Sequence, residues 1–481
     1  MTSPSNASTD VEGLDDILRG GLPRDRIYLL KGQPGAGKTT LALQFLRAGA
    51  KRGERVLYFT LSESREELLA VAQSHGWTLE GIEVFELQHA SLETGQYTMY
   101  HPSEVELGRA METLLAEVRR VQPARVVFDS LSEIRLLAQA PLRYRRQILD
   151  LKLQFAGTHC TVLLLDDHSG EVDNHLESLA HGVISLESHS PVYGGTRRRL
   201  EVVKLRGVAY RGGFHDFTIE RGGIEVFPRI IAAEHQPGHS PGRLSSGVAE
   251  LDELVGGGLN HGTATLLLGP AGSGKSALAT QFALSSAKKG ELAVYLTFDE
   301  TVGTFFARSD SLGMPVRAQV TAGNLRVQQI DPAEKSPGEL GHTIRLAVER
   351  DKARVVVIDS LTGYLNAMPE ERFLMNQLHE LLSFLGQHGV VTILVATQHG
   401  LIGSAMRSPI DVSYLADGVI LLRYFESGGE IRNAISCLKK RSGPHERTLH
   451  AFSMSAEGIH VGGSLADYHG ILGGIPDHVG V

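Results

Sequence analysis

Two copies of one glycine-rich pattern constrain this chain more than any other feature. They read Gly32-Gln-Pro-Gly-Ala-Gly-Lys-Thr39 and Gly269-Pro-Ala-Gly-Ser-Gly-Lys-Ser276. Each follows a short apolar run and precedes an amphipathic one, which predicts a strand, a tight turn and a helix. Backbone N–H groups at such a helix start hold phosphate, the lysine reaches the outer phosphates, and the hydroxyl reaches Mg²⁺. We therefore expect nucleotide contacts at Gly32, Gly35, Gly37, Lys38, Thr39 and Thr40, and again at Gly269, Gly272, Gly274, Lys275, Ser276 and Ala277.

The rest of the chain repeats in step with these two P-loops. The opening Gly13–Pro23 returns as Gly247–Leu259, and later landmarks recur 230 to 237 residues apart, as Lys38 and Lys275 do. This spacing indicates a tandem duplication. We predict a disordered N-terminus (1–10), a first domain (11–234), a linker rich in Pro and Gly (235–242), a second domain (243–465) and a C-terminal tail (466–481).

Each half alternates β-like apolar runs with helical runs, which is typical of an α/β domain with a mostly parallel sheet between helices. Antiparallel hairpins should follow in the first half, around Arg199–Lys204 and Phe214–Ile219. The expected parallel strands are Arg26–Lys31, Val56–Thr60, Val84–Leu87, Arg125–Asp129, Thr161–Asp166 and Gly182–Glu187, then Ala264–Gly269, Ala293–Phe298, Leu325–Gln329, Arg354–Asp359, Val391–Ala396 and Gly418–Tyr424.

Charge and composition narrow the classes of partner. A net charge of −8 gives no general attraction to nucleic acid or to an anionic membrane, so neither is an expected partner. No apolar run approaches the length of a membrane span, and the polar N-terminus lacks a signal-peptide core. The two cysteines, Cys160 and Cys437, border β-like runs and are expected to be reduced core thiols. We therefore predict a cytoplasmic protein.

Carboxylates end the strands that neighbour each P-loop strand. Asp129 and Asp359 close buried strands and are candidates to hold Mg²⁺ beside Thr39 and Ser276. A helix N-cap is the alternative for a lone Asp in this position, and the repetition favours the metal.

A second set of carboxylates follows the next predicted strand in each half. Glu63 in the first half and Asp299 with Glu300 in the second are candidate catalytic bases, with a solvated helix start as the alternative. Asp167 and Gln398 stand at what look like matching strand ends, where a polar side chain could contact the γ phosphate.

These residues together resemble the KaiC family of double-domain RecA-type ATPases and autokinases. The resemblance rests on both P-loops, the Phe298-Asp-Glu-Thr301 run, the Asp-Ser-Leu strand ends, and the basic runs beginning at Lys204 and Lys439. It covers about residues 11 to 480. It implies two tandem RecA-like P-loop domains, a homo-hexamer with ATP and Mg²⁺ at subunit interfaces, ATP hydrolysis, and serine autophosphorylation in the second domain.

The resemblance also implies roles for particular residues. Lys204, Arg206, Lys439 and Arg441 would contact the ATP of a neighbouring subunit, and Ser413 would accept the phosphoryl group. The chain departs from the family where Ser62 replaces the first of two glutamates and where Asp299 is the shorter acid. It departs again at Tyr414, which stands where the family has Thr after the acceptor Ser.

The sequence is therefore interpreted as a KaiC-like ATPase and serine/threonine autokinase that acts in signalling or timing, with a signalling protein as a possible partner. Two alternatives stay open. One is a nucleotide-gated assembly module with little catalysis, and the other is a RecA-type DNA-dependent ATPase. Fold alone does not separate the three, since one fold hosts many functions.

Overall fold

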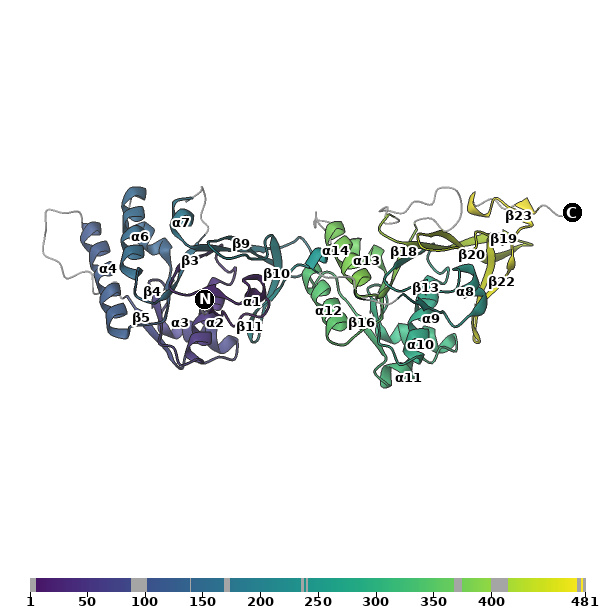
Figure 1. Cartoon of the computed structure of the whole chain (residues 1–481), viewed down its shortest axis with the longest axis horizontal. Helices are drawn as coiled ribbons and strands as arrows, with labels where there is room; N and C mark the ends of the chain where they lie inside the picture. Colours follow the sequence, from purple (N-terminus) through teal and green to yellow (C-terminus); the bar gives the residue numbers. More distant parts are fainter. Residues whose placement is uncertain are drawn as a thin grey trace. The chain divides into compact units, whose positions relative to one another are not determined.

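The computed structural model describes residues 6–87, 102–138, 140–167, 174–234, 238, 241–366, 374–398, 414–473 and 477–478. It divides into two compact units, Met1–Arg229 and Ile230–Val481, whose elements are shown in Figure 1. The segment just after the division belongs to the second unit, because Ile230 packs on its core and the Ala232 N–H donates to the Glu380 carboxylate at 2.8 Å.

The first unit is built on a nine-stranded sheet of order β11-β10-β9-β8-β3-β7-β6-β4-β5. The strands from β8 to β5 run parallel, and β8 to β11 form an antiparallel meander. The strands are β3 (Ile27–Gly32), β4 (Val56–Thr60), β5 (Ile82–Glu86), β6 (Arg125–Asp129), β7 (Thr161–Asp167), β8 (Gly182–His189), β9 (Arg197–Leu205), β10 (Phe214–Glu220) and β11 (Gly223–Phe227).

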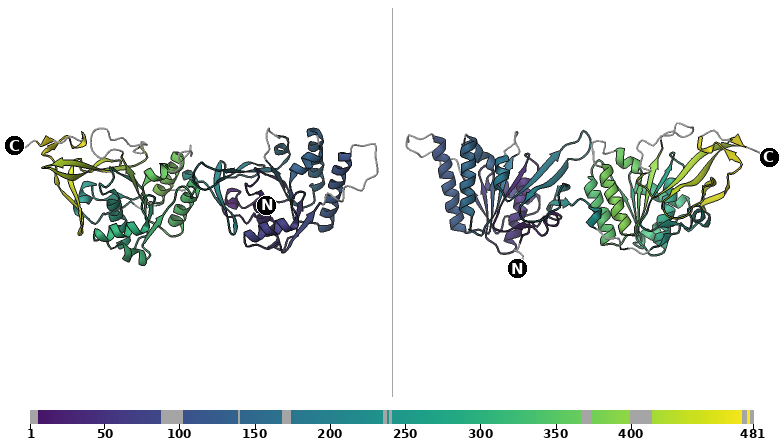
Figure 2. Two further views of the ribbon diagram at one scale, coloured as in Figure 1. Left: turned by 180° about the vertical axis from the view of Figure 1, so that it is seen from behind. Right: turned by 45° about the horizontal axis from the view of Figure 1, so that its top comes forward.

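Helices cover both faces of this sheet (Figure 2). Alternate residues of a strand point to opposite faces, so β3 sends Tyr28 into the core under α2 and Leu29 into the core under α6. The helices are α1 (Leu14–Ile17), α2 (Lys38–Ala50), α3 (Arg65–Ser74), α4 (Pro102–Val121), α5 (Leu131–Ala138), α6 (Pro141–Phe155) and α7 (Asn174–Leu179).

The second unit repeats the arrangement with strand order β16-β15-β17-β18-β14-β19-β20-β21-β22. Its strands are β14 (Ala264–Gly269), β15 (Ala293–Thr297), β16 (Leu325–Gln329), β17 (Val355–Asp359), β18 (Val391–Thr397), β19 (Gly418–Ser427), β20 (Glu430–Lys440), β21 (His450–Ser455) and β22 (Gly458–Ser464). Its helices are α8 (Ala249–Leu254), α9 (Lys275–Lys288), α10 (Val302–Ser311), α11 (Val316–Thr321), α12 (Pro337–Glu349), α13 (Leu361–Asn366) and α14 (Leu374–Gln387).

Short elements complete the two units. They are β1 (Asn6–Ala7), β2 (Leu22–Pro23), η2 (Ala232–Glu234), β12 (Arg243–Leu244), β13 (Leu259–Asn260), β23 (Tyr468–His469), η3 (Ile471–Gly473) and β24 (Asp477–His478). Among the described residues, no helix is both long and apolar enough to cross a lipid bilayer.

The fold class predicted from the sequence, two α/β domains each with a mostly parallel sheet, is confirmed, and both cysteines are buried and free. The prediction that residues 1–10 are disordered was wrong for residues 6–10, which the structure describes. There β1 pairs with β2, Ala7 is fully buried, and Thr9 donates to the Asp15 carboxylate at 2.7 Å. Strand β19 also runs three residues beyond Tyr424, because it pairs with β20 as far as Ser427.

The predicted C-terminal tail, residues 466–481, contains a residue that packs against the second unit. Ile471 is 1% exposed and packs with Phe425 and Ala434 of the β19–β20 hairpin. The apolar contact therefore extends the ordered second unit past residue 465.

Candidate functional site

Each P-loop connects the central strand of its sheet to the start of a long helix. β3 leads into α2 and β14 into α9, with Gly37 and Gly274 directly before the helices at φ of 104° and 98°. A side chain at Gly37 would have left-handed strain, and its Cβ would meet Ile219 at 2.6 Å. These glycines let the loop turn tightly enough to aim the free N–H groups of the helix start into one cradle.

The first P-loop lysine folds back over its own loop. The Lys38 ammonium donates to the backbone carbonyl of Gly32 at 2.7 Å and pairs with the Asp167 carboxylate at 2.7 Å. Asp167 comes from the end of β7, where it pairs in register with Gly32. The ammonium is therefore already held at the mouth of the loop, beside the position that phosphate would take.

Within the described residues, the second P-loop lysine forms no ion pair with a carboxylate, and Asp359 acts on it only through its charge. Lys275 donates to the carbonyl of Pro270 at 2.7 Å, and burial lowers its pKa to about 8. In the strand register, Gly269 lies opposite Thr397. The matching of Asp167 with Gln398 was therefore wrong by one residue, and Thr397 is the equivalent of Asp167. The Asp167 N–H donates to the Ser132 hydroxyl, and the Thr397 N–H donates to the Thr362 hydroxyl in the same way.

The two strand-end aspartates lie against the P-loop hydroxyls, as the magnesium hypothesis requires. The Thr39 hydroxyl donates to Asp129 at 3.3 Å, and Tyr58 donates to the same oxygen at 2.5 Å. Burial raises the pKa of Asp129, and the hydrogen bonds from Tyr58 and Thr39 oppose that rise. A carboxylate and a hydroxyl in contact are oxygen ligands that suit Mg²⁺, which takes its other ligands from phosphate and water.

The second half repeats this arrangement. Tyr295 donates to Asp359 at 2.5 Å; burial raises the pKa of Asp359, and hydrogen bonds from Tyr295 and Ser276 oppose that rise. The N-cap alternative loses support here, because the hydroxyl of Ser360, the next residue, accepts the Gly363 N–H of α13 at 3.0 Å. Among the described residues there is no cluster of three or more His, Cys, Asp or Glu side chains able to bind a metal by itself.

Glu63 follows the end of β4, is half-buried, and lies close enough to Asp129 to be affected by its charge. Its backbone is fixed by Thr60, whose hydroxyl accepts the Glu63 N–H at 2.9 Å and donates to its carbonyl at 2.7 Å. Within the described part of the chain, its buried Oε2 has no hydrogen-bond partner. Burial raises the pKa of Glu63, and the charges of Asp129 and Glu67 raise it further, against Lys38. A carboxyl with a raised pKa and an oxygen free of hydrogen bonds is suited to accept a proton.

Asp299 and Glu300 do not act as a pair in this structure. Asp299 accepts a hydrogen bond from Ser360 and lies against α13, so close that a Cβ at Gly363 would sit 2.3 Å from its Oδ1. Glu300 instead points to α10, where Arg308 donates to both of its oxygens at 2.6 and 3.3 Å. The two neighbouring acids therefore have different environments and different chemistry.

The four basic residues assigned to a neighbouring ATP lie far from their own P-loops. Val419 pairs with Lys439 in the β19–β20 ladder, and β19 enters the sheet beside Thr265, at the opposite end of β14 from Gly269. Because Thr265 and Gly269 are four residues apart on β14, they are separated by about 13 Å along the strand. Lys204 has the same relation to β3, because it pairs with Val183 in the β8–β9 ladder.

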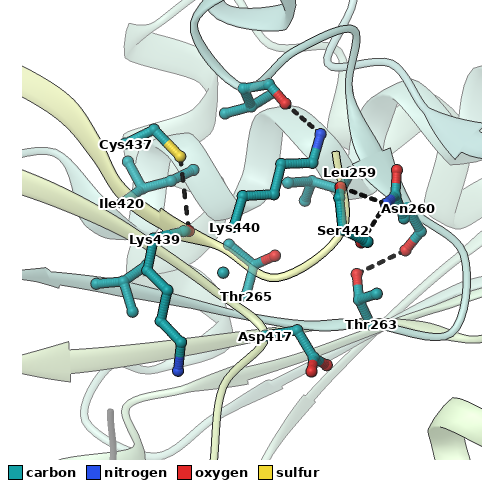
Figure 3. A pocket seen from close by; sticks show the side chains of 13 residues that line it. Leu259, Asn260, Thr263, Thr265, Asp417, Ile420, Cys437, Lys439, Lys440 and Ser442 are labelled. Atoms are coloured by element: carbon teal, nitrogen blue, oxygen red, sulfur yellow. Dashed lines mark hydrogen bonds between the residues drawn. The ribbon is translucent and has the colours of Figure 1, made fainter. Parts of the chain in front are cut away.

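These basic side chains contact the segments that precede β8 and β19. Lys204 donates to the carbonyl of Glu177, Arg206 to that of Ser178 at 2.9 Å, and Lys439 to that of Ala416 at 2.8 Å. Arg441 pairs with Asp417 at 3.1 Å. Figure 3 shows Lys439 and Lys440 pointing to opposite sides of β20, around a small pocket. They therefore lie at the end of the sheet opposite the P-loop of their own unit.

The proposed phosphoacceptor Ser413 lies outside the described residues. Its neighbour Tyr414 is 56% exposed, and its backbone carbonyl accepts a hydrogen bond from Arg441 at 3.2 Å. That contact places Tyr414 beside the basic run that ends at Arg441.

Sequence reasoning did not identify three residues that shape the site. Tyr58 and Tyr295 hold the strand-end aspartates, and their repetition at equivalent strand positions is a signal that the sequence contains. Arg308 is not repeated between the halves. It lies eight residues after Glu300, and the residue eight positions after Glu63 is Val71, so the sequence contains no signal for it.

Comparison with known proteins bears on the whole chain. The ATPase family described as KaiC matches residues 7–230 and again residues 244–466. The circadian clock oscillator protein KaiC of Acaryochloris marina is 28% identical over 98% of this chain and 91% of its own length. The circadian clock protein KaiC3 of Synechocystis is 28% identical over 97% of this chain and 94% of its own length. The circadian clock oscillator protein KaiC of Synechococcus elongatus is 26% identical over 100% of this chain and 95% of its own length.

Proposed function

Because this chain belongs to the KaiC family of ATPases, we propose that it binds Mg-ATP at both P-loops and hydrolyses it at interfaces between copies of itself in a homo-hexamer. The observation that carries the proposal is the repeated set of a folded-back lysine, a helix-start hydroxyl and a strand-end aspartate in each unit. A duplicated set of this kind is hard to explain without a nucleotide triphosphate as its ligand.

The residues present fit Mg-ATP and divide the work among themselves. Lys38 and Lys275 neutralise the outer phosphates, while Thr39 with Asp129 and Ser276 with Asp359 hold Mg²⁺, which offsets charge on the β and γ phosphates. Glu63 accepts the proton of the water that attacks phosphorus in the first half. The bond to the leaving oxygen breaks as the new P–O bond forms, and ADP departs with that oxygen.

Measured turnover separates this proposal from its two alternatives. Purified chain with ATP should release phosphate only when Mg²⁺ is present, and single-stranded DNA should not raise the rate. Turnover that needs DNA would support the recombinase class. Nucleotide-dependent assembly without phosphate release would support the signalling module and refute hydrolysis.

The basic residues at the far ends of β9 and β20 are proposed to act on a neighbour's ATP, as arginine fingers do. Neither Lys38→Ala chains nor Arg206→Ala chains should be active in the first half when each is alone. Mixed rings should regain activity, because an intact P-loop from one chain meets an intact Arg206 from the other. Lys275→Ala in both chains confines the assay to the first half. Mixtures no more active than the parents would contradict action in trans.

Serine autophosphorylation at Ser413 is the finer part of the proposal. Chains incubated with Mg-ATP should gain the mass of one phosphoryl group, located by fragmentation at Ser413 and absent from Ser413→Ala. Tyr414→Phe is the matched control and should keep the gain. Hydrolysis without any mass gain, or an unchanged gain in Ser413→Ala, would remove the kinase assignment and leave the ATPase.

A further inference from the structure

The glutamates that follow β4 and β15 have the same backbone setting in the two halves. Thr60 and Thr297 each accept the N–H of the glutamate three residues later, at 2.9 Å for Glu63 and 3.3 Å for Glu300. Each threonine hydroxyl also donates to the carbonyl of the same glutamate, at 2.7 and 2.9 Å. The two carboxyl groups therefore start from equivalent points on equivalent strands.

Their side chains then meet opposite environments. Arg308 of α10 binds both oxygens of Glu300, and each side chain of this ion pair is 22% exposed. The guanidinium also lies over the Phe305 ring at 5.2 Å and within 3.4 Å of the Thr280 hydroxyl. This support fixes Arg308 in place, so that the fork-shaped contact with Glu300 is preorganised.

The first half has neither the arginine nor the threonine at the equivalent positions. Val71 occupies the position of Arg308, and Leu43, five residues after Lys38, occupies that of Thr280. The charged groups that face Glu63 are Asp129 of β6, Glu67 of α3 and Lys38 of α2. Those recorded around Glu300 are Arg308 of α10 and Asp359 of β17.

We propose that Arg308 is a positioning residue that withholds Glu300 from proton transfer, leaving Asp299 as the base of the second half, whereas the unpaired Glu63 is the base of the first. This inference rests on the proposed ATPase function. A carboxylate with both oxygens on a guanidinium has one lone pair of each oxygen engaged and its direction fixed. Asp299 is hydrogen-bonded at Oδ2 by Ser360. No hydrogen bond to its Oδ1 is found within the described residues, so that oxygen is the one proposed to accept the proton of the attacking water.

The second half is tested in full-length chains that carry Lys38→Ala, so that only its turnover is measured. Asp299→Asn should lower turnover by about 100-fold, as loss of a general base does. Glu300→Gln should have a smaller effect, and its turnover should stay at least about tenfold above that of Asp299→Asn. Equal losses, a larger loss in Glu300→Gln, or no turnover that depends on Asp299 would each overturn the assignment.

The pH profile then tests Arg308 itself, because a purely structural role would not move it. Arg308→Met should free Glu300 as a second base and add a second acid limb to the profile, which Arg308→Lys should not add. The added limb should disappear in Arg308→Met with Glu300→Gln. One profile shared by all of these variants would contradict the positioning role.

The reciprocal experiment installs the ion pair in the first half, in chains that carry Lys275→Ala. Val71→Arg should reduce turnover by about tenfold or more and move the acid limb to lower pH, since a guanidinium beside Glu63 lowers its pKa. Val71→Met is the control of similar length without charge. Identical profiles for these two variants would overturn the inference, whereas absence of turnover in the unaltered chain would overturn the ATPase proposal itself.

Discussion

Lys38→Ala should remove nucleotide from the first half only, and Lys275→Ala from the second half only. Each lysine makes charge-assisted contacts with the outer phosphates, and losing them should weaken affinity in that half by about 100-fold. The larger loss is expected for Lys38→Ala, because it also leaves the Asp167 carboxylate, now 2.7 Å from the ammonium, unneutralised beside the phosphates. Bound nucleotide per chain, measured after desalting, reports both effects.

Lysines elsewhere on the same helices provide the controls. Lys51 follows the end of α2 and pairs with Asp10, and Lys288 is an exposed residue at the end of α9. Their alanine variants should bind nucleotide as the unaltered chain does. Unchanged occupancy in Lys38→Ala or Lys275→Ala would remove that P-loop from the proposal. Second-half affinity should also fall as pH rises past about 8, where the buried Lys275 ammonium loses its proton.

Glu63→Gln should lower first-half turnover by about 100-fold or more while leaving nucleotide bound, because the amide cannot take the proton of the attacking water. The unaltered first half should also lose activity as pH falls, through a pKa above the usual glutamate value of 4.5, since burial favours the protonated form. Rate against pH in a Lys275→Ala chain measures both effects. A profile that stays flat down to pH 4.5 would contradict Glu63 as the base.

Glu67→Gln is the matched control, four residues along the same segment. Glu67 is exposed and accepts the Ser64 N–H at 2.7 Å as the last residue of a capping box on α3. Its replacement should lower stability only slightly, since Gln can still cap the helix, and should change turnover by less than about twofold. Glu63→Gln should have the opposite effect on stability. Because the pKa of Glu63 is raised in the folded state, its contribution to stability is full below the unfolded-state pKa and is lost as pH rises through the folded-state pKa. At neutral pH the charged carboxylate therefore destabilises the fold, and Glu63→Gln should raise the free energy of unfolding.

Much of the fold could be read from local pattern. The strands that carry Asp129 and Asp359 are runs of buried apolar residues. The carboxyl end of each was placed correctly, because a parallel strand covered on both faces has no polar alternation to obscure it, and the second strand begins at Val355, one residue after the predicted start. The P-loops were equally clear, since their glycines are needed for a backbone conformation that few other residues adopt. Local pattern failed at residues 6–10, whose polar composition hides contacts with Asp15 and β2.

The sequence by itself determined the duplication, the two nucleotide loops and the strand-end carboxylates, because each is specified by residues adjacent in the chain. Only the tertiary structure decided what those carboxylates contact. Asp299 and Glu300 are neighbours in sequence, yet one joins Ser360 from β17 and α13 and the other joins Arg308 from α10. Asp167 reaches Lys38 across more than a hundred residues. The acidity and the reach of a carboxyl group depend on the charges within a few ångströms, and that set is assembled by folding rather than by order along the chain.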